Sequence, residues 1–140
     1  MKRDYGVFHV ALKLLLWKGG KFLFLKSPNG KWDLPGGRID NVEYRAPLTR
    51  VLAREVREEL GGVKYQLGKS VFQYKRLTAS KENYVFLTVF EARYLSGQIK
   101  LSQEHKSFHW VDPKNLTLKQ KDFLDAEEYR AFKKHLNRRN

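Results

Sequence analysis

The beginning of the chain alternates apolar and polar positions with the two-residue period of a β-strand. Across residues 7–17 the even positions are apolar, and the residues are Phe8, Val10, Leu12, Leu14 and Leu16. His9, Ala11 and Lys13 lie between them, which predicts a strand. Lys18 and two glycines then predict a turn, and the apolar run at residues 22–25 predicts a second strand that pairs back as a hairpin.

Residues 47–60 carry the pattern of an amphipathic helix. Leu48, Leu52, Val56 and Leu60 recur every four positions, and Val51 widens the same stripe. Pro47 fits the first helical turn, where its missing N–H costs no hydrogen bond. Gly61 and Gly62 follow the last apolar residue, so we expect the helix to end there.

The rest of the chain predicts four strands and a second helix. The strands are expected at residues 71–77, 84–95, 98–101 and 108–111, and helical spacing of Tyr129, Phe132 and Leu136 predicts the helix. Residues 84–90 are apolar on both faces, so their strand is expected to be central. Strands, a helix, more strands and a second helix predict a mixed sheet with helices packed on its faces, an α/β (α+β) fold. We expect one domain over residues 1–140.

Composition excludes several classes of protein. The chain has 41% hydrophobic residues and no cysteine, which indicates a folded protein without disulfides or thiolate metal sites. The N-terminal segment has no cleavage signal and no apolar run is long enough to cross a membrane, so we expect a cytoplasmic protein with no membrane partner. The net charge of +13 would attract polyanionic partners such as nucleotides, pyrophosphates or RNA, although the charge taken by itself is as well explained by a basic surface that serves solubility alone.

Three glutamates are crowded on one side of the first helix. Glu55, Glu58 and Glu59 are three or four residues apart, and their mutual repulsion is roughly 1 to 3 kcal/mol. They also lie near the negative end of the helix dipole, which disfavours an anion by about 0.3 to 1 kcal/mol. A magnesium ion would remove the conflict, because Mg²⁺ prefers carboxylate oxygens. The alternative is an ordinary exposed helix on which Arg54 and Arg57 screen the acids.

The surrounding residues favour the metal interpretation. The chain reads WDLPGGRI over residues 32–39, then Glu43, then REVREELG over residues 54–61. This sequence resembles the Nudix box from Gly37 to Gly61, with ten residues instead of the usual seven between Glu43 and Arg54. Residues 101–105 and 108–111 are similar to a segment that many Nudix proteins carry before their C-terminal helix. The resemblance implies an α/β/α sandwich with a mixed central sheet.

The resemblance also implies a metal site and a mechanism. The positions that match the family's ligands are the Gly36 carbonyl, Glu55, Glu58 and Glu59, and Glu104 is a candidate for a further ligand from outside the box. The cofactor implied is Mg²⁺, with Mn²⁺ as a possible substitute. Arg54 matches the arginine that holds the glutamates, and Glu55 is the first choice for the base that orients a water. We therefore predict Glu55, Arg54 and Glu58 as catalytic residues.

Substrate contacts are predicted around the glycine turn. Lys26, Arg38 and Gly37 flank the proposed phosphate site, although Lys26 and Arg38 are as consistent with exposed loop cations. The role of Glu43 is open, because a strict seven-residue spacer would place Ala46 at its position. We expect the three extra residues in the loop before the helix, where insertions are tolerated. His105 and His109 could contact the substrate and Trp32 could stack on a base, but structural roles are the first expectation for all three.

These observations predict a hydrolase that cleaves a phosphoanhydride bond in a nucleoside diphosphate linked to another moiety. The substrate would be a nucleoside triphosphate, a sugar nucleotide, a dinucleoside polyphosphate or the capped 5′ end of an RNA, and the enzyme a monomer or a homodimer. The alternative is a module of the same fold that binds nucleotides or RNA without turnover. A basic nucleic-acid-binding protein of another family ranks last, because the chain has no motif for one.

Overall fold

The computed structural model describes residues 1–139 of the chain. Its strands are β1 (Phe8–Lys18), β2 (Lys21–Lys26), β3 (Trp32–Asp33), β4 (Gly36–Arg38), β5 (Lys64–Leu77), β6 (Tyr84–Ser96) and β7 (Ser107–Val111). The helices are α1 (Leu48–Leu60) and α2 (Ala126–Arg139), with short 3-10 helices η1 (Asn41–Glu43), η2 (Pro113–Asn115) and η3 (Gln120–Asp122). No helix in residues 1–139 is both long and apolar enough to cross a membrane.

All the strands belong to one mixed sheet, as the sequence predicts. Its main path runs β3-β2-β1-β6-β5, while β4 pairs with β1 and β7 pairs with β2. The pairing of β1 with β6 is parallel, and the other pairings are antiparallel. The strand expected to be central, β6, lies between β1 and β5, which confirms that expectation.

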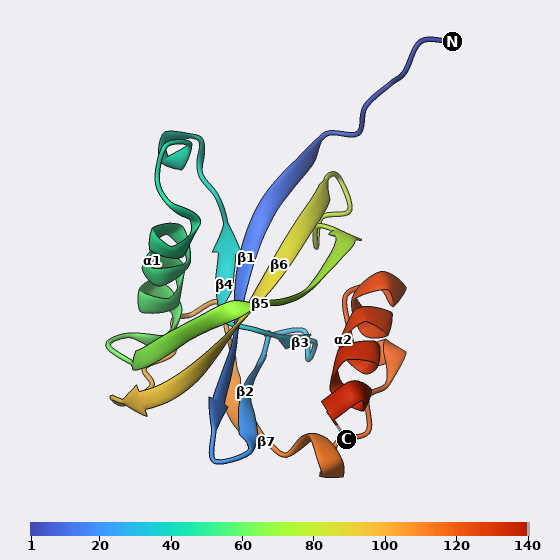
Figure 1. The fold of residues 1–140 in the computed structure, drawn as a ribbon. Helices are drawn as coiled ribbons and strands as arrows, with labels where there is room; N and C mark the ends of the chain where they lie inside the picture. The colour runs from blue at the N-terminus through green and yellow to red at the C-terminus, as the bar shows by residue number, and fades with distance from the viewer. Residues whose placement is uncertain (140) are drawn as a thin grey trace.

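The two helices cover opposite faces of this sheet (Figure 1). One core cluster joins α1 to even positions of β1, such as Leu12 and Leu14. The other joins α2 to odd positions, such as Ala11 and Leu15. The strict alternation of strand side chains explains how one strand serves both cores. The α/β/α sandwich expected from the sequence is therefore confirmed.

The strand expected at residues 98–101 is wrong. That segment instead donates backbone hydrogen bonds to the end of α1, from Lys100 to the Leu60 carbonyl at 2.9 Å and from Ser102 to the Glu59 carbonyl at 3.1 Å. Carbonyls of the last helical turn have no partner within the helix, so this pairing satisfies them. The interaction places residues 101–105 beside the end of α1 that carries the glutamates.

Smaller differences concern the ends of α1. Pro47 precedes the helix as its N-cap instead of lying in the first turn. Leu48 is half exposed, whereas Leu52, Val56 and Leu60 are fully buried, so the apolar stripe is buried only from the second turn onward. Gly61 ends the helix with a φ of +80°, a conformation that glycine adopts without strain.

Candidate active site

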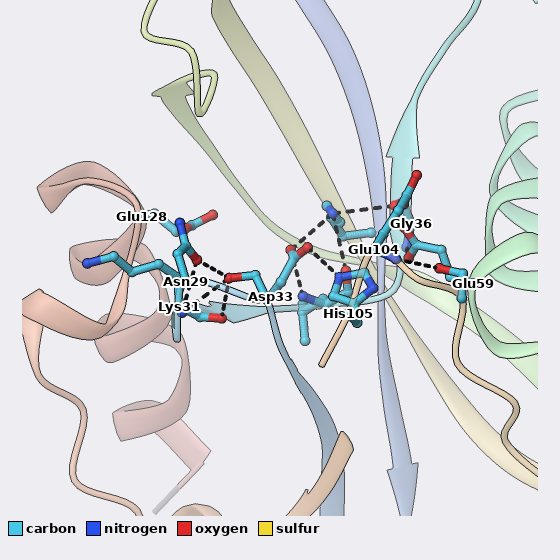
Figure 2. A network of polar contacts seen from close by, with 12 residues as sticks. Asn29, Lys31, Asp33, Gly36, Glu59, Glu104, His105 and Glu128 are labelled. Carbon is cyan, nitrogen blue, oxygen red and sulfur yellow. Dashed lines mark hydrogen bonds and ion pairs between the residues drawn. The ribbon is translucent and has the colours of Figure 1, made fainter. Parts of the chain in front are cut away.

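The two glycines of β4 bring the backbone against both β1 and α1. Gly36 has a φ of +136°, and a Cβ there would overlap the Leu12 carbonyl oxygen and lie 2.8 Å from the Cα of Lys13. The Gly36 N–H donates to Glu59 Oε1 at 2.9 Å (Figure 2). A Cβ on Gly37 would overlap the carboxylate of Glu55. Only residues without side chains permit this approach.

Glu55 and Glu59, one helical turn apart, are the carboxylates that face these glycines. Burial raises the pKa of Glu59 to about 7, against the opposing attraction of Lys13 and the Gly36 hydrogen bond. Burial also raises the pKa of Glu55, although Arg54 opposes the shift. Burial disfavours the charged form of a carboxylate, so both side chains would gain from a cation beside them.

Arg54 joins three glutamates at the edge of the site. Its Nε and Nη2 atoms each lie 2.6 Å from an oxygen of Glu43, a bidentate pair across eleven positions of sequence. The guanidinium also lies 2.9 Å from Glu55 and 3.2 Å from Glu58. Glu43 additionally accepts the Asp40 N–H at 3.0 Å and closes a capping box on η1. The turn η1, which ends at Glu43 just before the longer spacer, therefore delivers Glu43 to the box arginine.

A buried charge network that sequence reasoning missed lies behind the glycines. The Lys13 ammonium is 3.0 Å from Asp33 Oδ1 and donates to the Leu34 carbonyl at 3.2 Å and the Gly36 carbonyl at 3.4 Å. Asp33 Oδ2 lies 3.0 Å from His105 Nε2 (Figure 2). Burial alone would lower the pKa of Lys13, but the Asp33 and Glu59 carboxylates raise it above its usual value.

The signal that would have identified Lys13 lies in its neighbours. Residues 11–16 are all buried, so β1 has no solvent face there, and a lysine in that run requires an internal anion. Alternation alone places Lys13 on the face opposite the even-numbered leucines and does not say whether that face is buried. Burial would raise the pKa of Asp33, but the neighbouring Lys13 and His105 hold it well below its usual range.

These groups line a cavity of about 700 Å³, called here the first cavity. Its wall on the α1 side comes from Gly36, Gly37, Glu55 and Glu59, with Arg38, Glu104 and His105 beside them. Arg76 of β5 lines the opposite wall, where Glu128 of α2 holds its Nε at 2.9 Å. The volume is in the range that holds a nucleotide-sized ligand.

The predicted metal ligands are only partly gathered. Gly36, Glu55, Glu59 and Glu104 line the first cavity, whereas Glu58 is exposed and turned to Arg54. Within residues 1–139 no three His, Asp or Glu side chains are close enough together to hold a metal ion. The donors are nevertheless hard oxygens, and two of them are carboxylates whose raised pKa values a cation would lower. Their chemistry fits Mg²⁺.

Two of the three predicted substrate-binding residues line the first cavity, and the third does not. Gly37 and Arg38 line the first cavity, and the exposed Arg38 lies 3.0 Å from His9 Nδ1. Lys26 is not among the residues that line it, and its ammonium lies over the Trp32 ring at 4.3 Å from the centroid. Trp32 in turn stacks on the core residue Phe24 with 4.5 Å between ring centroids, and it also lines the first cavity.

Comparisons with known proteins agree with the fold and with the box. A family model described as the NUDIX domain matches residues 7–134. The nucleoside triphosphatase NudI of Escherichia coli is 24% identical over 73% of this chain and 80% of its own. The crystal structure of a MutT protein from Methanosarcina mazei is 27% identical, with a TM-score of 0.76 over 99% of both chains. A MutT Nudix hydrolase from Burkholderia pseudomallei is 22% identical, with a TM-score of 0.71 over 91% of this chain and 96% of that one.

Proposed function

Because the chain belongs to the Nudix hydrolase family, whose members act on nucleoside diphosphate derivatives, we propose that it is a magnesium-dependent pyrophosphohydrolase. It would cleave a phosphoanhydride bond in a nucleoside diphosphate linked to another moiety. The single observation that carries the proposal is the pair Glu55 and Glu59, two carboxylates of raised pKa in one cavity beside side-chain-free Gly36 and Gly37. Mn²⁺ is expected to substitute for Mg²⁺.

Four groups would hold the cation: the Gly36 carbonyl, Glu55, Glu59 and Glu104. Bound there, it would neutralise charge on the phosphate oxygens and lower the pKa of a coordinated water. Glu58 pairs with Arg54 at the exposed edge. We propose that Glu58 would leave Arg54 and bind the cation when the cation is present.

Glu55 is the proposed base. Arg54, 2.9 Å from its carboxylate, fixes its orientation, and Gly37 leaves space in front of it. The carboxylate would orient a water and accept its proton while the water oxygen bonds to phosphorus and the bridging oxygen departs with the bonding electrons. Lys13, Arg38 and Arg76 add positive charge on the walls that face the phosphates. The overall reaction converts one substrate and one water into two products that each end in a phosphate.

The test is release of phosphate or nucleotide product from a panel of substrates. The panel holds nucleoside triphosphates, sugar nucleotides, dinucleoside polyphosphates and capped RNA, each with Mg²⁺, with Mn²⁺ and with a chelator. We expect metal-dependent turnover that Glu55→Gln and Glu59→Gln each lower by about 100-fold or more, because each removes a charge that acts on the reacting water or cation. The isosteric control is Glu127→Gln, on the exposed surface of α2.

Absence of turnover on every member, with unchanged nucleotide binding in Glu55→Gln and Glu59→Gln, would contradict the proposal. The chain would then be a binding module of the Nudix fold. Dependence on metal together with loss in both variants, but not in the control, would support it.

A further inference from the structure

A second cavity lies on the other side of the catalytic helix's Glu55. It has a volume of about 950 Å³ and is bounded by the start of β1, by residues 39–46 before α1, and by the exposed end of α1. It shares two lining residues with the first cavity, and these are Arg38 and Glu55. The two cavities therefore meet at Glu55, the proposed base, and at Arg38, which is predicted to bind substrate phosphates.

The turn η1 and the start of the longer spacer build one wall of the second cavity. Residues 40–44 form η1 with its Asp40 cap, and Glu43 ties this turn to α1 through Arg54 at 2.6 Å. Glu43, directly before the spacer, is thus fixed by charged hydrogen bonds, and the start of the spacer is held by the backbone bond from the Ala46 N–H to the Glu43 carbonyl at 2.9 Å. Val42 and Tyr44 on this turn are 90% and 86% exposed, although both are large and apolar.

The facing wall is apolar as well. Phe8 and Val10 of β1 are each 39% exposed, and the Phe8 ring packs on Tyr84 with 5.3 Å between centroids, which holds it in position. Contiguous exposed apolar side chains in a hollow mark a binding surface more often than chance exposure does. Rings at the walls with polar groups such as Asn41 and His9 among them match a nucleobase, because every base has a face that stacks on aromatic rings.

On this basis we propose that the second cavity binds a second nucleoside, so that the preferred substrates are dinucleoside polyphosphates. The inference rests on the proposed function. One nucleoside would occupy the first cavity, the phosphate chain would pass Arg38 and Glu55, and the other nucleoside would occupy the second cavity. Each volume alone suffices for one nucleotide, so a nucleoside triphosphate would leave the second cavity without a ligand.

The reaction balances as a hydrolysis. Water adds to one phosphorus of diadenosine tetraphosphate, one bridging P–O bond breaks, and the products are either ATP and AMP or two ADP molecules. No oxidant or further reactant is required. The second nucleoside contributes binding energy away from the bond that breaks.

The experiment compares diadenosine tetraphosphate with adenosine tetraphosphate, which has the same number of phosphates and lacks only the second adenosine. Affinities are measured by calorimetry with a chelator present, so that no hydrolysis takes place. We expect the intact protein to bind the dinucleotide about tenfold more tightly, the effect of one good base–aromatic stack. Tyr44→Ala and Phe8→Ala should each remove most of this preference.

Two variants provide the controls. Phe108→Ala removes a ring that is 40% exposed, close to the 39% of Phe8, from β7 outside both cavities, and should leave the preference unchanged. Tyr44→Ala removes a side chain that is nearly all in solvent, so a fold defect would not explain its effect. With Mg²⁺ present, the same variants should lower kcat/KM for the dinucleotide about tenfold more than for adenosine tetraphosphate.

Equal affinity for the two ligands, or equal losses for both in the variants, would overturn the inference. So would a change of oligomeric state in Tyr44→Ala without a change in preference, because the surface would then be an interface between copies of the chain. Failure of the proposed function is distinguishable, because it would appear as absence of turnover with both ligands. The difference in affinity between the two ligands would still test whether the second cavity binds a nucleoside.

Discussion

Glu59 is a buried carboxylate, and its burial disfavours the charged form. The side chain is 4% exposed and its closest partner is the uncharged Gly36 N–H. Its pKa of about 7 is raised by burial from 4.5, so the folded chain binds the proton more tightly than the unfolded chain does. The contribution of Glu59 to the free energy of unfolding is therefore largest at acidic pH, falls as pH rises from about 4.5 to about 7, and stays low above that.

Glu59→Gln should therefore stabilise the protein in neutral and alkaline solution. At pH 8 without metal we expect the free energy of unfolding to increase by about 2 to 3 kcal/mol, because the amide keeps an acceptor for Gly36 and carries no buried charge. Near pH 4 the difference should disappear. Urea unfolding at both pH values measures it, and a variant less stable than the parent at pH 8 would refute the burial argument.

Single residues also show where sequence reasoning ends. The carboxylates Glu55 and Glu59 and the box arginine could be named as candidates, because their spacing and neighbours are local in the sequence. Lys13, Asp33 and Arg76 could not, because their partners lie 20 or more positions away and only the folded sheet brings them together. Glu43 was left open for the same reason, since its pairing with Arg54 depends on how the extra spacer residues fold.

At the scale of elements, we expect the two adjacent glycines of β4 to have different roles. Gly36 would be required for stability of the fold, and Gly37 would be required for activity. Gly36→Ala should lower the free energy of unfolding by about 3 kcal/mol or more, because its φ of +136° is strained for alanine and its Cβ meets the backbone of β1. Gly37→Ala meets only the Glu55 carboxylate, the far end of a flexible side chain. We expect that variant to stay folded and to lose turnover.

Thermal unfolding and product release on both variants measure this pair. Equal stability of the two variants would refute the assignment of the backbone contact to Gly36. Full turnover in Gly37→Ala would show that Glu55 does not need the space that Gly37 leaves.

Elements that bury a face were predictable from their apolar pattern. The patterns located β1, β2, β6, β7 and both helices to within a few residues. The strand expected at residues 71–77 is the second half of β5, whose first half, residues 64–70, was missed because most of its side chains are at least partly exposed. Strands β3 and β4 have two and three residues, too few for a period, and arise from pairing with β2 and β1. Residues 98–101 have enough apolar positions for a strand, but the Lys100 N–H donates to the Leu60 carbonyl at the end of α1 instead of to a neighbouring strand.

At the scale of the whole molecule, the +13 charge should assist association with phosphorylated substrates. Raising the ionic strength from about 0.01 M to about 1 M shortens the screening length from about 30 Å to about 3 Å. We expect kcat/KM for a tetraphosphate substrate to fall by about tenfold or more over that range, and kcat at saturation to change little. Initial rates at several salt concentrations test this, and a substrate with fewer phosphates should show the smaller slope. Salt-independent kcat/KM would mean that the basic surface serves solubility alone.

The parallel pairing of β1 with β6 has a consequence for synthesis of the chain. Phe8 pairs with Tyr84, 76 positions later, so β1 cannot complete its hydrogen bonds until β6 has been made. At about 5 to 20 residues per second, translation takes roughly 4 to 15 s to cover that distance. Throughout this interval the leucine-rich strand has β2 and β4 as its only strand partners, and the edge that will pair with β6 is open to other nascent chains. Chaperone demand on this protein should therefore be concentrated in the seconds before residue 96 leaves the ribosome.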